Sequence, residues 1–425
     1  MSAATTSQAT KQATDQTTSQ QTTSQQTTSG AIEARSQEVT GAGAAASPPP
    51  RPTQVEEHAS AQPDAPASLK PPILPPAHPA RATALLVGLG VGIVALTVVS
   101  AGVGQMRLAP GEVVHVLAAR LGLDLGSEPQ AANADAVLMS IRLPRLALAA
   151  LSGAALATAG AVMQGVFRNP LAEPGVVGVS SGAAAAACGG IALGAGTVAG
   201  ALAPWTIAGL AFAGGLGTTL LVYALARSNG RTEVVTLVLT GVAVNAVAGA
   251  AIAMFVFLAD TSAREEIIFW QLGSLNGTRW QYVAVAAPIV LAATVAAMTL
   301  ARQLDLLALG ERSARHLGVD VERLRLGAIV LVALLTAAAV AFSGVIAFVG
   351  LVVPHLIRMV AGPGHRLLLP ASALGGAVLL MAADLVARTA VDYADLPIGM
   401  LTSLVGGPFF FYLLRRTRRQ AGGWG

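Results

Sequence analysis

Charged residues are scarce in this chain. Asp, Glu, Lys and Arg make up 11% of its 425 residues, whereas a typical soluble domain carries about 25%. Apolar residues make up 54%, so the composition excludes an ordinary soluble domain and predicts an integral membrane protein. The sequence pI of about 9.7 would suit nucleic-acid binding, but the basic residues lie beside apolar runs, as membrane-orientation signals do. We therefore expect no nucleic acid as a partner.

Cysteine and nucleotide-binding motifs are also lacking. The single cysteine, Cys188, has no partner for an internal disulfide or a zinc site, and it is interpreted as a packing residue. The histidines show no metal-ligand spacing, so no metal site is expected. No G-x-x-x-x-G-K-[ST] phosphate loop occurs, so any ATP hydrolysis would require a separate polypeptide.

The N-terminal residues 1–80 differ in composition from the rest. TTSQ occurs at Thr5, Thr17 and Thr22, and residues 47–80 are rich in Pro and Ala. Neither piece can bury enough apolar surface to offset its ordering entropy, which predicts a disordered cytoplasmic tail. The tail lacks the basic start and short apolar core of a cleaved signal peptide. The first hydrophobic segment is therefore expected to target the membrane itself.

Residues 152–183 predict two membrane helices and their elbow. The run from Leu146 to Val166 has no charged side chain and is long enough to cross a bilayer core of roughly 30 Å. Gly153, Ala157 and Ala161 recur every four residues on one face, which lets another helix approach closely. An Asn-Pro turn follows, and then a second run of small residues begins.

The apolar runs predict an all-α, polytopic domain over residues 81–425 with about ten transmembrane helices. The spans are 81–107, 146–166, two within 173–227 with a break near 194–204, 233–260, 279–302, one full and one broken span within 325–358, 367–386 and 396–414. This topology places about 19 of the 26 Lys and Arg on the side of the termini and about 7 on the other, which predicts cytoplasmic termini.

Two segments between spans are predicted to lie in water. Residues 111–122 form a short amphipathic helix, and the loop 302–325 mixes charge into an amphipathic pattern, with a helix over 311–317 and Gly318 ending it. The break at Ser343-Gly344 differs, because non-helical backbone at membrane depth is tolerated only inside protein or along a cavity.

Five motifs carry a family resemblance. The chain resembles permeases of the iron-chelate and vitamin B12 ABC importer family at IRLPR (141–145), GVFRNPLAEPGVVGVSSGA (165–183), LGERSARHLGV (309–319), SGVIAFVGLVVPHLIR (343–358) and LPIGMLTSLVGGP (396–408). The resemblance implies a homodimer of ten-helix subunits in the plasma (inner) membrane, with the pathway along the dimer axis. It also implies two ABC ATPase subunits that carry ATP and Mg, and an extracytoplasmic substrate-binding protein. The permease itself is expected to be no enzyme and to bind no cofactor.

The resemblance assigns three outer arginines to docking. In the family, arginines at the positions of Arg142, Arg145 and Arg388 meet carboxylates of the binding protein, and a guanidinium suits such bidentate contacts. We expect them to be exposed. Alternatively, they anchor helix ends at the membrane interface, with Arg388 paired to Asp384 one turn earlier.

Within the coupling loop, residues 302–325, the segment 310–318 resembles the family's coupling helix, which sits in a cleft of the ATPase. Small residues there would allow close approach and charged ones would fix register; a plain solvated helix is the alternative. The assigned residues are Gly310, Glu311, Arg312, Ser313, Ala314, Arg315, Leu317 and Gly318.

Three residues are candidates for the pathway or its gate. Asn169 and Leu171 match positions near the family's cytoplasmic gate, although the neighbouring loop 229–234 does not match the gate pattern. Asn245 lies deep in a predicted span, where a polar side chain needs a partner or a watery cavity. It either lines the pathway or bonds a neighbouring helix.

The sequence also bears on the substrate of the permease and on two other protein classes. Residues 163–183 and 269–277 are most similar to haem permeases, followed by ferric siderophore and then cobalamin permeases. A secondary transporter driven by an ion gradient is expected to carry ionisable residues inside its spans, which are nearly absent here. Ser180 fits G-x-S-x-G, but it lies in a Gly/Ala run, which argues against a protease. His355 lies near the cytoplasmic end of a span, on the wrong side to capture haem, and is interpreted as structural.

Overall fold

The computed structural model describes residues 79–104, 108–120, 122–123, 133–195, 202–228, 231–391 and 393–420. The chain divides into two units, Met1–Pro71 and Pro72–Gly425, and all the described residues belong to the second unit. The predicted tail, residues 1–80, lies outside the described residues except for Pro79 and Ala80, with which the first described helix begins.

In the part of the chain that the structure describes, ten apolar helices follow the predicted spans in order. Seven are long and apolar enough to cross a membrane: α2 (Pro79–Gly102), α5 (Leu143–Phe167), α7 (Ala203–Leu225), α8 (Val234–Leu258), α10 (Trp280–Thr299), α13 (Val321–Ser343) and α15 (His365–Ala387). Three have shorter apolar stretches: α6 (Val179–Ala192), α14 (Val349–Ala361) and α16 (Ile398–Gln420). The expected all-α membrane fold is confirmed.

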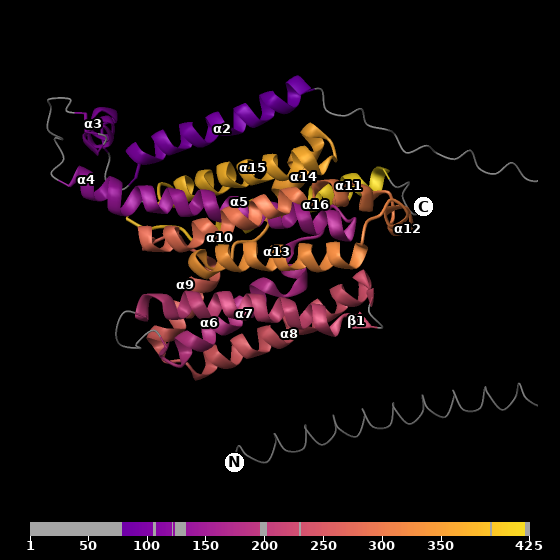
Figure 1. Ribbon diagram of the computed structural model, residues 1–425. Coiled ribbons are helices and arrows are strands. Elements are labelled where there is room, and N and C mark those ends of the chain that lie inside the picture. The colour runs from indigo at the N-terminus through magenta and orange to yellow at the C-terminus, as the bar shows by residue number, and fades with distance from the viewer. Residues whose placement is uncertain are drawn as a thin grey trace, which may run out of the picture. The chain divides into compact units, whose positions relative to one another are not determined.

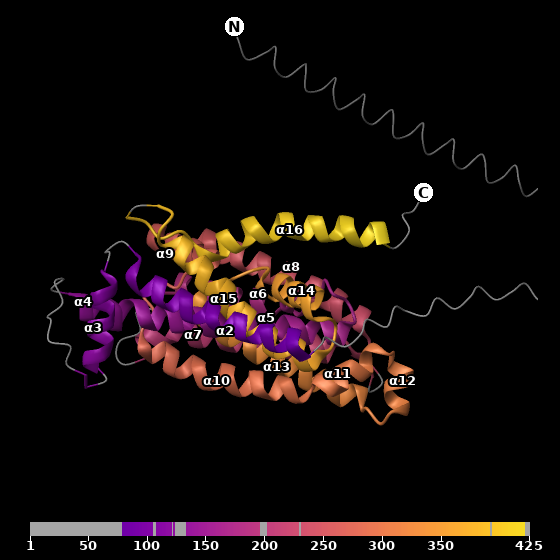
Figure 2. The ribbon, with the colours of Figure 1, turned by 90° about the horizontal axis from the view of Figure 1, so that it is seen from above.

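Short elements connect these helices. They are α3 (Pro110–Arg120), α4 (Ala134–Ala136), the π-helix η1 (Val137–Arg142), the 3₁₀ helix η2 (Pro174–Val177), the hairpin of β1 (Arg227–Ser228) and β2 (Arg231–Thr232), α9 (Thr261–Leu272), α11 (Ala301–Ala308) and α12 (Glu311–His316). Figures 1 and 2 both place α11 and α12 at one end of the bundle and α3 and α4 at the other.

Helix α5 is the most buried span, and small residues set its packing. A Cβ atom on Gly153 would lie 2.1 Å from the carbonyl oxygen of Gly376 in α15, and one on Gly160 would lie 1.8 Å from that of Gly350 in α14. Backbones can approach this closely only where no side chain intervenes. The predicted close approach of another helix is therefore confirmed at Gly153, and α5 lies among α10, α13, α14 and α15 (Figure 1).

Helices α6, α7 and α8 form a second group beside α13 (Figure 1). A Cβ atom on Gly182 of α6 would lie 2.7 Å from the carbonyl oxygen of Gly214 in α7. Likewise, one on Gly241 of α8 would lie 1.9 Å from the carbonyl oxygen of Val176 in η2. The same small-residue chemistry therefore holds both groups together.

The break between α13 and α14 lies inside the protein, as predicted. Helix α13 ends at Ser343, and Gly344 has a φ of 67° that an L side chain rarely adopts. The freed backbone finds partners in other connections, since the Ser274 N–H donates to the Ser343 carbonyl at 2.8 Å and the Ile398 N–H donates to the Gly273 carbonyl at 2.9 Å. Backbone groups in three connections, those after α9, after α13 and before α16, thus hydrogen-bond to one another inside the protein.

Candidate functional site

The three predicted docking arginines converge at the end of the bundle that holds α3 and α4. Arg142 ends the π-helix η1, Arg145 lies in the first turn of α5, and Arg388 caps α15. π-Helical turns are rare and frequent at functional sites. Together with Tyr393 and Asp395, the arginines line a cavity of about 470 Å³. We call Arg142, Arg145, Arg388, Asp384 and Asp395 the arginine cluster.

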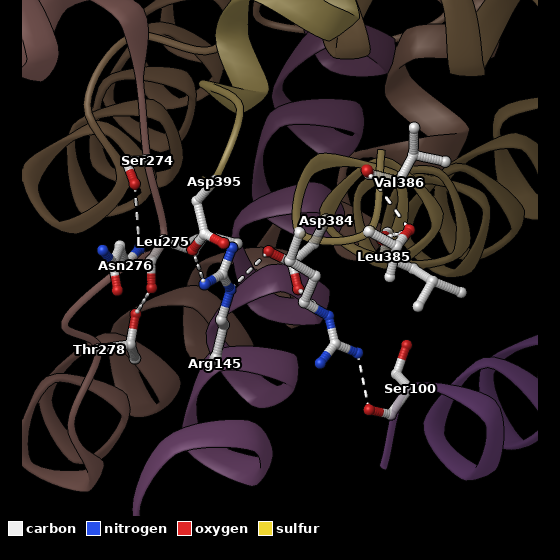
Figure 3. A network of polar contacts seen from close by, with 12 residues as sticks. Ser100, Arg145, Ser274, Leu275, Asn276, Thr278, Asp384, Leu385, Val386 and Asp395 are labelled. Atoms are coloured by element: carbon white, nitrogen blue, oxygen red, sulfur yellow. Dashed lines mark hydrogen bonds and ion pairs between the residues drawn. The ribbon is translucent and has the colours of Figure 1, made fainter. Parts of the chain in front are cut away.

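Arg145 is held between two carboxylates (Figure 3). Its Nε lies 2.7 Å from Asp384 Oδ1, and its Nη1 lies 2.6 Å from Asp395 Oδ2. Arg388 lies 3.7 Å from the second oxygen of Asp384, one turn away on α15, which is the alternative pairing considered from the sequence. A single fully buried carboxylate therefore serves two arginines.

Two further guanidinium contacts go to the end of α2. Arg142 donates to the carbonyl oxygen of Ala101, and Arg388 donates to that of Ser100 at 2.7 Å. The last carbonyls of a helix have no partner within it and carry the negative end of the helix dipole, so cations stabilise them.

The expectation of exposed arginines was wrong. Arg142, Arg145 and Arg388 are only 4%, 7% and 7% exposed. They are buried because internal carboxylates and carbonyls supply partners, of which the sequence revealed only Asp384 for Arg388. Among the residues lining the cavity, Arg145 and Arg388 are paired with Asp384 or Asp395, and Arg142 donates to a carbonyl oxygen. Docking itself stays a prediction.

The coupling loop forms a separate short helix at the other end. α12 begins after Gly310, whose φ is 108°, and Gly318 with a φ of 85° follows it. Arg312, Ser313 and Arg315 are exposed, as are Leu317 and Gly318. Ala314 is fully buried, however, so the interpretation of this residue as a small surface contact was wrong. It faces the subunit's own core because α12 packs against α11 and α13.

Glu311, in the first turn of α12, is the centre of an ion network. Its Oε1 pairs with Arg325 of α13 and lies 3.9 Å from Arg168 Nη2, while its Oε2 lies 3.5 Å from Arg315. Arg325 also donates to the carbonyl oxygen of Thr232 in β2 at 2.8 Å. Sequence reasoning assigned Glu311 to this end but missed Arg325, whose only signal was a charge at the start of an apolar run.

The elbow after α5 lies beside this network. Arg168 adopts a left-handed conformation with φ 50° and ends α5. Asn169 Oδ1 accepts the N–H of Leu171 at 2.9 Å, which fixes a tight turn. The structure thus places the two gate candidates next to a residue that contacts the coupling helix.

Asn245 is bonded at both ends of its side chain. Nδ2 donates to the Gly175 carbonyl of η2 at 3.3 Å, and Oδ1 accepts the hydroxyl of Ser181 in α6 at 2.5 Å. This matches the alternative in which Asn245 bonds neighbouring elements. The Ser181 hydroxyl also lies 3.0 Å from the Gly178 carbonyl oxygen, and the contact with Asn245 helps to seat η2 between α6 and α8.

Two carboxylates outside the spans have shifted pKa values. Burial raises the pKa of Glu173 in the elbow. Burial also acts to raise the pKa of Asp305 in α11, but hydrogen bonds from the ring and the backbone N–H of His365 outweigh it and bring that pKa below its usual value. The pair ties α11 to the start of α15 and was not anticipated. Among the residues that the structure describes, no three His, Cys, Asp or Glu are grouped so that they could hold a metal ion.

Comparisons with known proteins agree with this architecture. The chain matches the FecCD transport family over residues 92–416. It is 45% identical to the hemin transport system permease protein of Yersinia pestis, covering 68% of this chain and 85% of that protein. It is 46% identical to the cobalamin import system permease protein of Halobacterium salinarum, covering 67% and 74%, and 42% identical to the Fe(3+) dicitrate permease protein of Escherichia coli, covering 66% and 86%.

A solved structure shares the fold. A chain from a metal-chelate type ABC transporter in an inward-facing conformation matches with a TM-score of 0.67 and 32% sequence identity, covering 79% of this chain and 99% of its own. The family match spans the ten apolar helices from within α2 to within α16. The chain therefore belongs to the FecCD transport family and is a multi-pass permease subunit of an ABC importer.

Proposed function

We propose that this permease carries an iron chelate into the cytoplasm by alternating access in a homodimer, with haem or a ferric siderophore as the substrate. The observation that carries the proposal is the 45% identity to a hemin permease over most of both chains. The three relatives carry different cargo at 42% to 46% identity, so identity alone supports the class of metal chelates more strongly than one member.

Energy for transport comes from two ABC ATPase subunits that hold ATP and Mg. The chain has no phosphate loop of its own, and α12 presents Arg312, Ser313 and Arg315 outside the spans. A short helix with exposed charges and little bulk suits insertion into a cleft of a partner. This chain is expected to bind no cofactor.

The extracytoplasmic binding protein docks at the cavity of the arginine cluster. Arg142, Arg145 and Arg388 all line this cavity, and a guanidinium suits bidentate recognition of a carboxylate, so the mouth favours an acidic side chain from a partner. Because the guanidiniums are buried, we expect such a carboxylate to enter the cavity rather than to pair on an open surface. Asn169 and Leu171 belong to the cytoplasmic gate in this proposal, whereas Asn245 holds η2 against α6 and α8.

The end with α12 faces the cytoplasm. Arg312, Arg315 and Arg323 are exposed there, and the arginine-rich end of α16 lies at the same end in both views (Figures 1 and 2). An excess of Lys and Arg marks cytoplasmic loops. Both termini would then be cytoplasmic in the plasma (inner) membrane.

Two alternatives differ in cargo or in energy source. A cobalamin importer is favoured by the 46% identity to a cobalamin permease. An ion-driven secondary transporter would use an ionisable group within its spans. The buried Asp384 is such a group, but it is paired with Arg145.

Vesicle uptake distinguishes these functions. The permease would be reconstituted with its ATPase and binding protein, and uptake of haem, ferric siderophores and cobalamin would be measured with ATP and with a non-hydrolysable analogue. ATP-dependent accumulation of haem or a siderophore is expected. Accumulation of cobalamin alone would select that alternative, and uptake driven by an ion gradient without ATP would contradict the ABC mechanism.

A further inference from the structure

A buried guanidinium bridges the coupling helix and the connection that precedes α8. Arg325 lies one turn into α13, and its side chain is only 5% exposed. Its Nη2 pairs with Glu311 of α12, and its Nη1 donates to the Thr232 carbonyl of β2 at 2.8 Å. The Arg325 side chain thus contacts two segments, α12 and β2, that are far apart in the sequence.

A second carboxylate closes this bridge. Glu322 Oε2 accepts the Thr232 N–H at 3.1 Å, and its Oε1 lies 3.4 Å from Arg325 Nη1. Both backbone groups of Thr232 are therefore bound by charged side chains of α13. Since α8 begins at Val234, two residues later, a displacement of Thr232 acts directly on the start of α8.

Glu311 extends the connection to α5. Arg168, the left-handed residue at the end of α5, lies 3.9 Å from the same carboxylate oxygen that pairs with Arg325. One carboxylate of α12 is therefore shared between α13 and the elbow before η2. The starts or ends of α5, α8, α12 and α13 all meet in this network.

The chemistry favours a rigid link over a loose surface contact. A guanidinium holds two partners in a fixed fork, whereas an ammonium acts as a point charge. Arg325 is nearly buried whereas Glu311 is 29% exposed, so removing Glu311 would leave the guanidinium without its carboxylate, and the pairing resists separation when α12 moves. A solvated loop helix would need none of these contacts, because Ala314 already packs α12 onto the subunit.

We propose that Arg325 is a positioning residue that transmits displacement of α12 to the hairpin of β1 and β2, and so to α8, while Glu311 transmits it to α5 through Arg168. The inference rests on the proposed function, because the displacement of α12 is attributed to an ATPase. Loss of the Arg325 guanidinium is therefore expected to lower the amount of substrate moved per ATP hydrolysed while the ATPase stays bound.

The test measures ATP hydrolysis and substrate uptake in the same vesicles, using the complete complex. In Arg325→Gln we expect an assembled complex, hydrolysis within about twofold of the wild type, and a fall of about tenfold in substrate moved per ATP. The matched control is Arg323→Gln, two residues away, since Arg323 is 89% exposed and pairs with Asp320 at the surface. Its ratio of uptake to hydrolysis should stay within about twofold of the wild type.

The conservative variant separates coupling from folding. Arg325→Lys keeps the charge but cannot bridge both partners, so an assembled complex with a ratio reduced by about threefold or more is expected. An assembled Arg325→Gln or Arg325→Lys complex with the wild-type ratio would overturn the inference. A wild-type complex that hydrolyses ATP but accumulates no chelate would instead contradict the proposed function.

Discussion

Asp384 is the residue on which the arginine cluster depends. It has no exposed area and lies 2.7 Å from Arg145 and 3.7 Å from Arg388. Burying a carboxylate is costly unless a cation compensates it, and two arginines without it would share Asp395 alone. The cluster therefore joins the start of α5 to the end of α15 through one charge.

Replacing this charge should destabilise the whole subunit. In Asp384→Asn the shape is kept, but the buried arginines lose a partner, and we expect a loss of about 3 to 5 kcal/mol of folding free energy. Thermal unfolding of the purified permease in detergent measures it. The exposed Asp320→Asn is the control and should cost less than about 1 kcal/mol. Equal melting temperatures for the two variants would show that Asp384 is not needed for stability.

Some ion-pair partners of the arginine cluster can be predicted from the sequence, and others cannot. The pairing of Arg388 with Asp384 follows from helical spacing, because residues four apart share a face. The pairing of Arg145 with Asp395 joins positions 250 residues apart and depends on the tertiary packing of α5. The burial of Ala314 was likewise hidden, since a helix of six residues is too short for its buried face to be read from periodicity.

Small residues, rather than large apolar ones, determine how the helices pack. The contacts of Gly153 with Gly376 and of Gly160 with Gly350 place backbone against backbone. Lipid offers no hydrophobic drive for helix association, so close packing of this kind supplies the attraction. The position of α5 between α14 and α15 therefore depends on glycine at residues 153 and 160, where a Cβ atom would clash with the neighbouring backbone.

A single methyl group on this face should separate the helices. In Gly160→Ala the added carbon would lie 1.8 Å from the Gly350 carbonyl oxygen, so the backbone must move, at a cost of about 1 to 3 kcal/mol or more. This exceeds the helix-propensity gain of about 1 kcal/mol for Gly to Ala. Gly217→Ala on α7, where nothing lies within 4 Å, should be neutral or stabilising. Thermal unfolding compares them, and a Gly160→Ala variant as stable as Gly217→Ala would refute the argument.

The seven long helices of the described residues were predictable because their apolar runs match the thickness of a bilayer. The break after Ser343 was also predictable, since Ser-Gly interrupts an uncharged run. The π-helix Val137–Arg142 and the hairpin before α8 left no such pattern. Both depend on contacts with distant segments, as the bonds from Arg142 to Ala101 and from Arg325 to Thr232 show.

The two candidate surfaces lie at opposite ends of the subunit, and α5 connects them. Arg145 in its first turn belongs to the arginine cluster, and Arg168 at its end contacts Glu311 of α12. Because α5 is packed on most of its surface by α10, α13, α14 and α15, it can move only together with these helices. The docking proposed at the arginine cluster would therefore have a rigid route to the coupling loop.

In the assembled importer, the exposed face of α12 is expected to contact the ATPase. Ser313 is small and exposed, whereas its neighbour Ala314 is buried, so bulk at Ser313 projects outward without disturbing the subunit's packing. Ser313→Trp should keep a monodisperse permease but lose co-purification with a tagged ATPase. The control is Ser262→Trp, an exposed serine in α9 away from the coupling loop, which should retain the ATPase. An intact complex with Ser313→Trp would mean that the ATPase contacts another surface, because no cleft that closes around α12 could accommodate an indole at its centre.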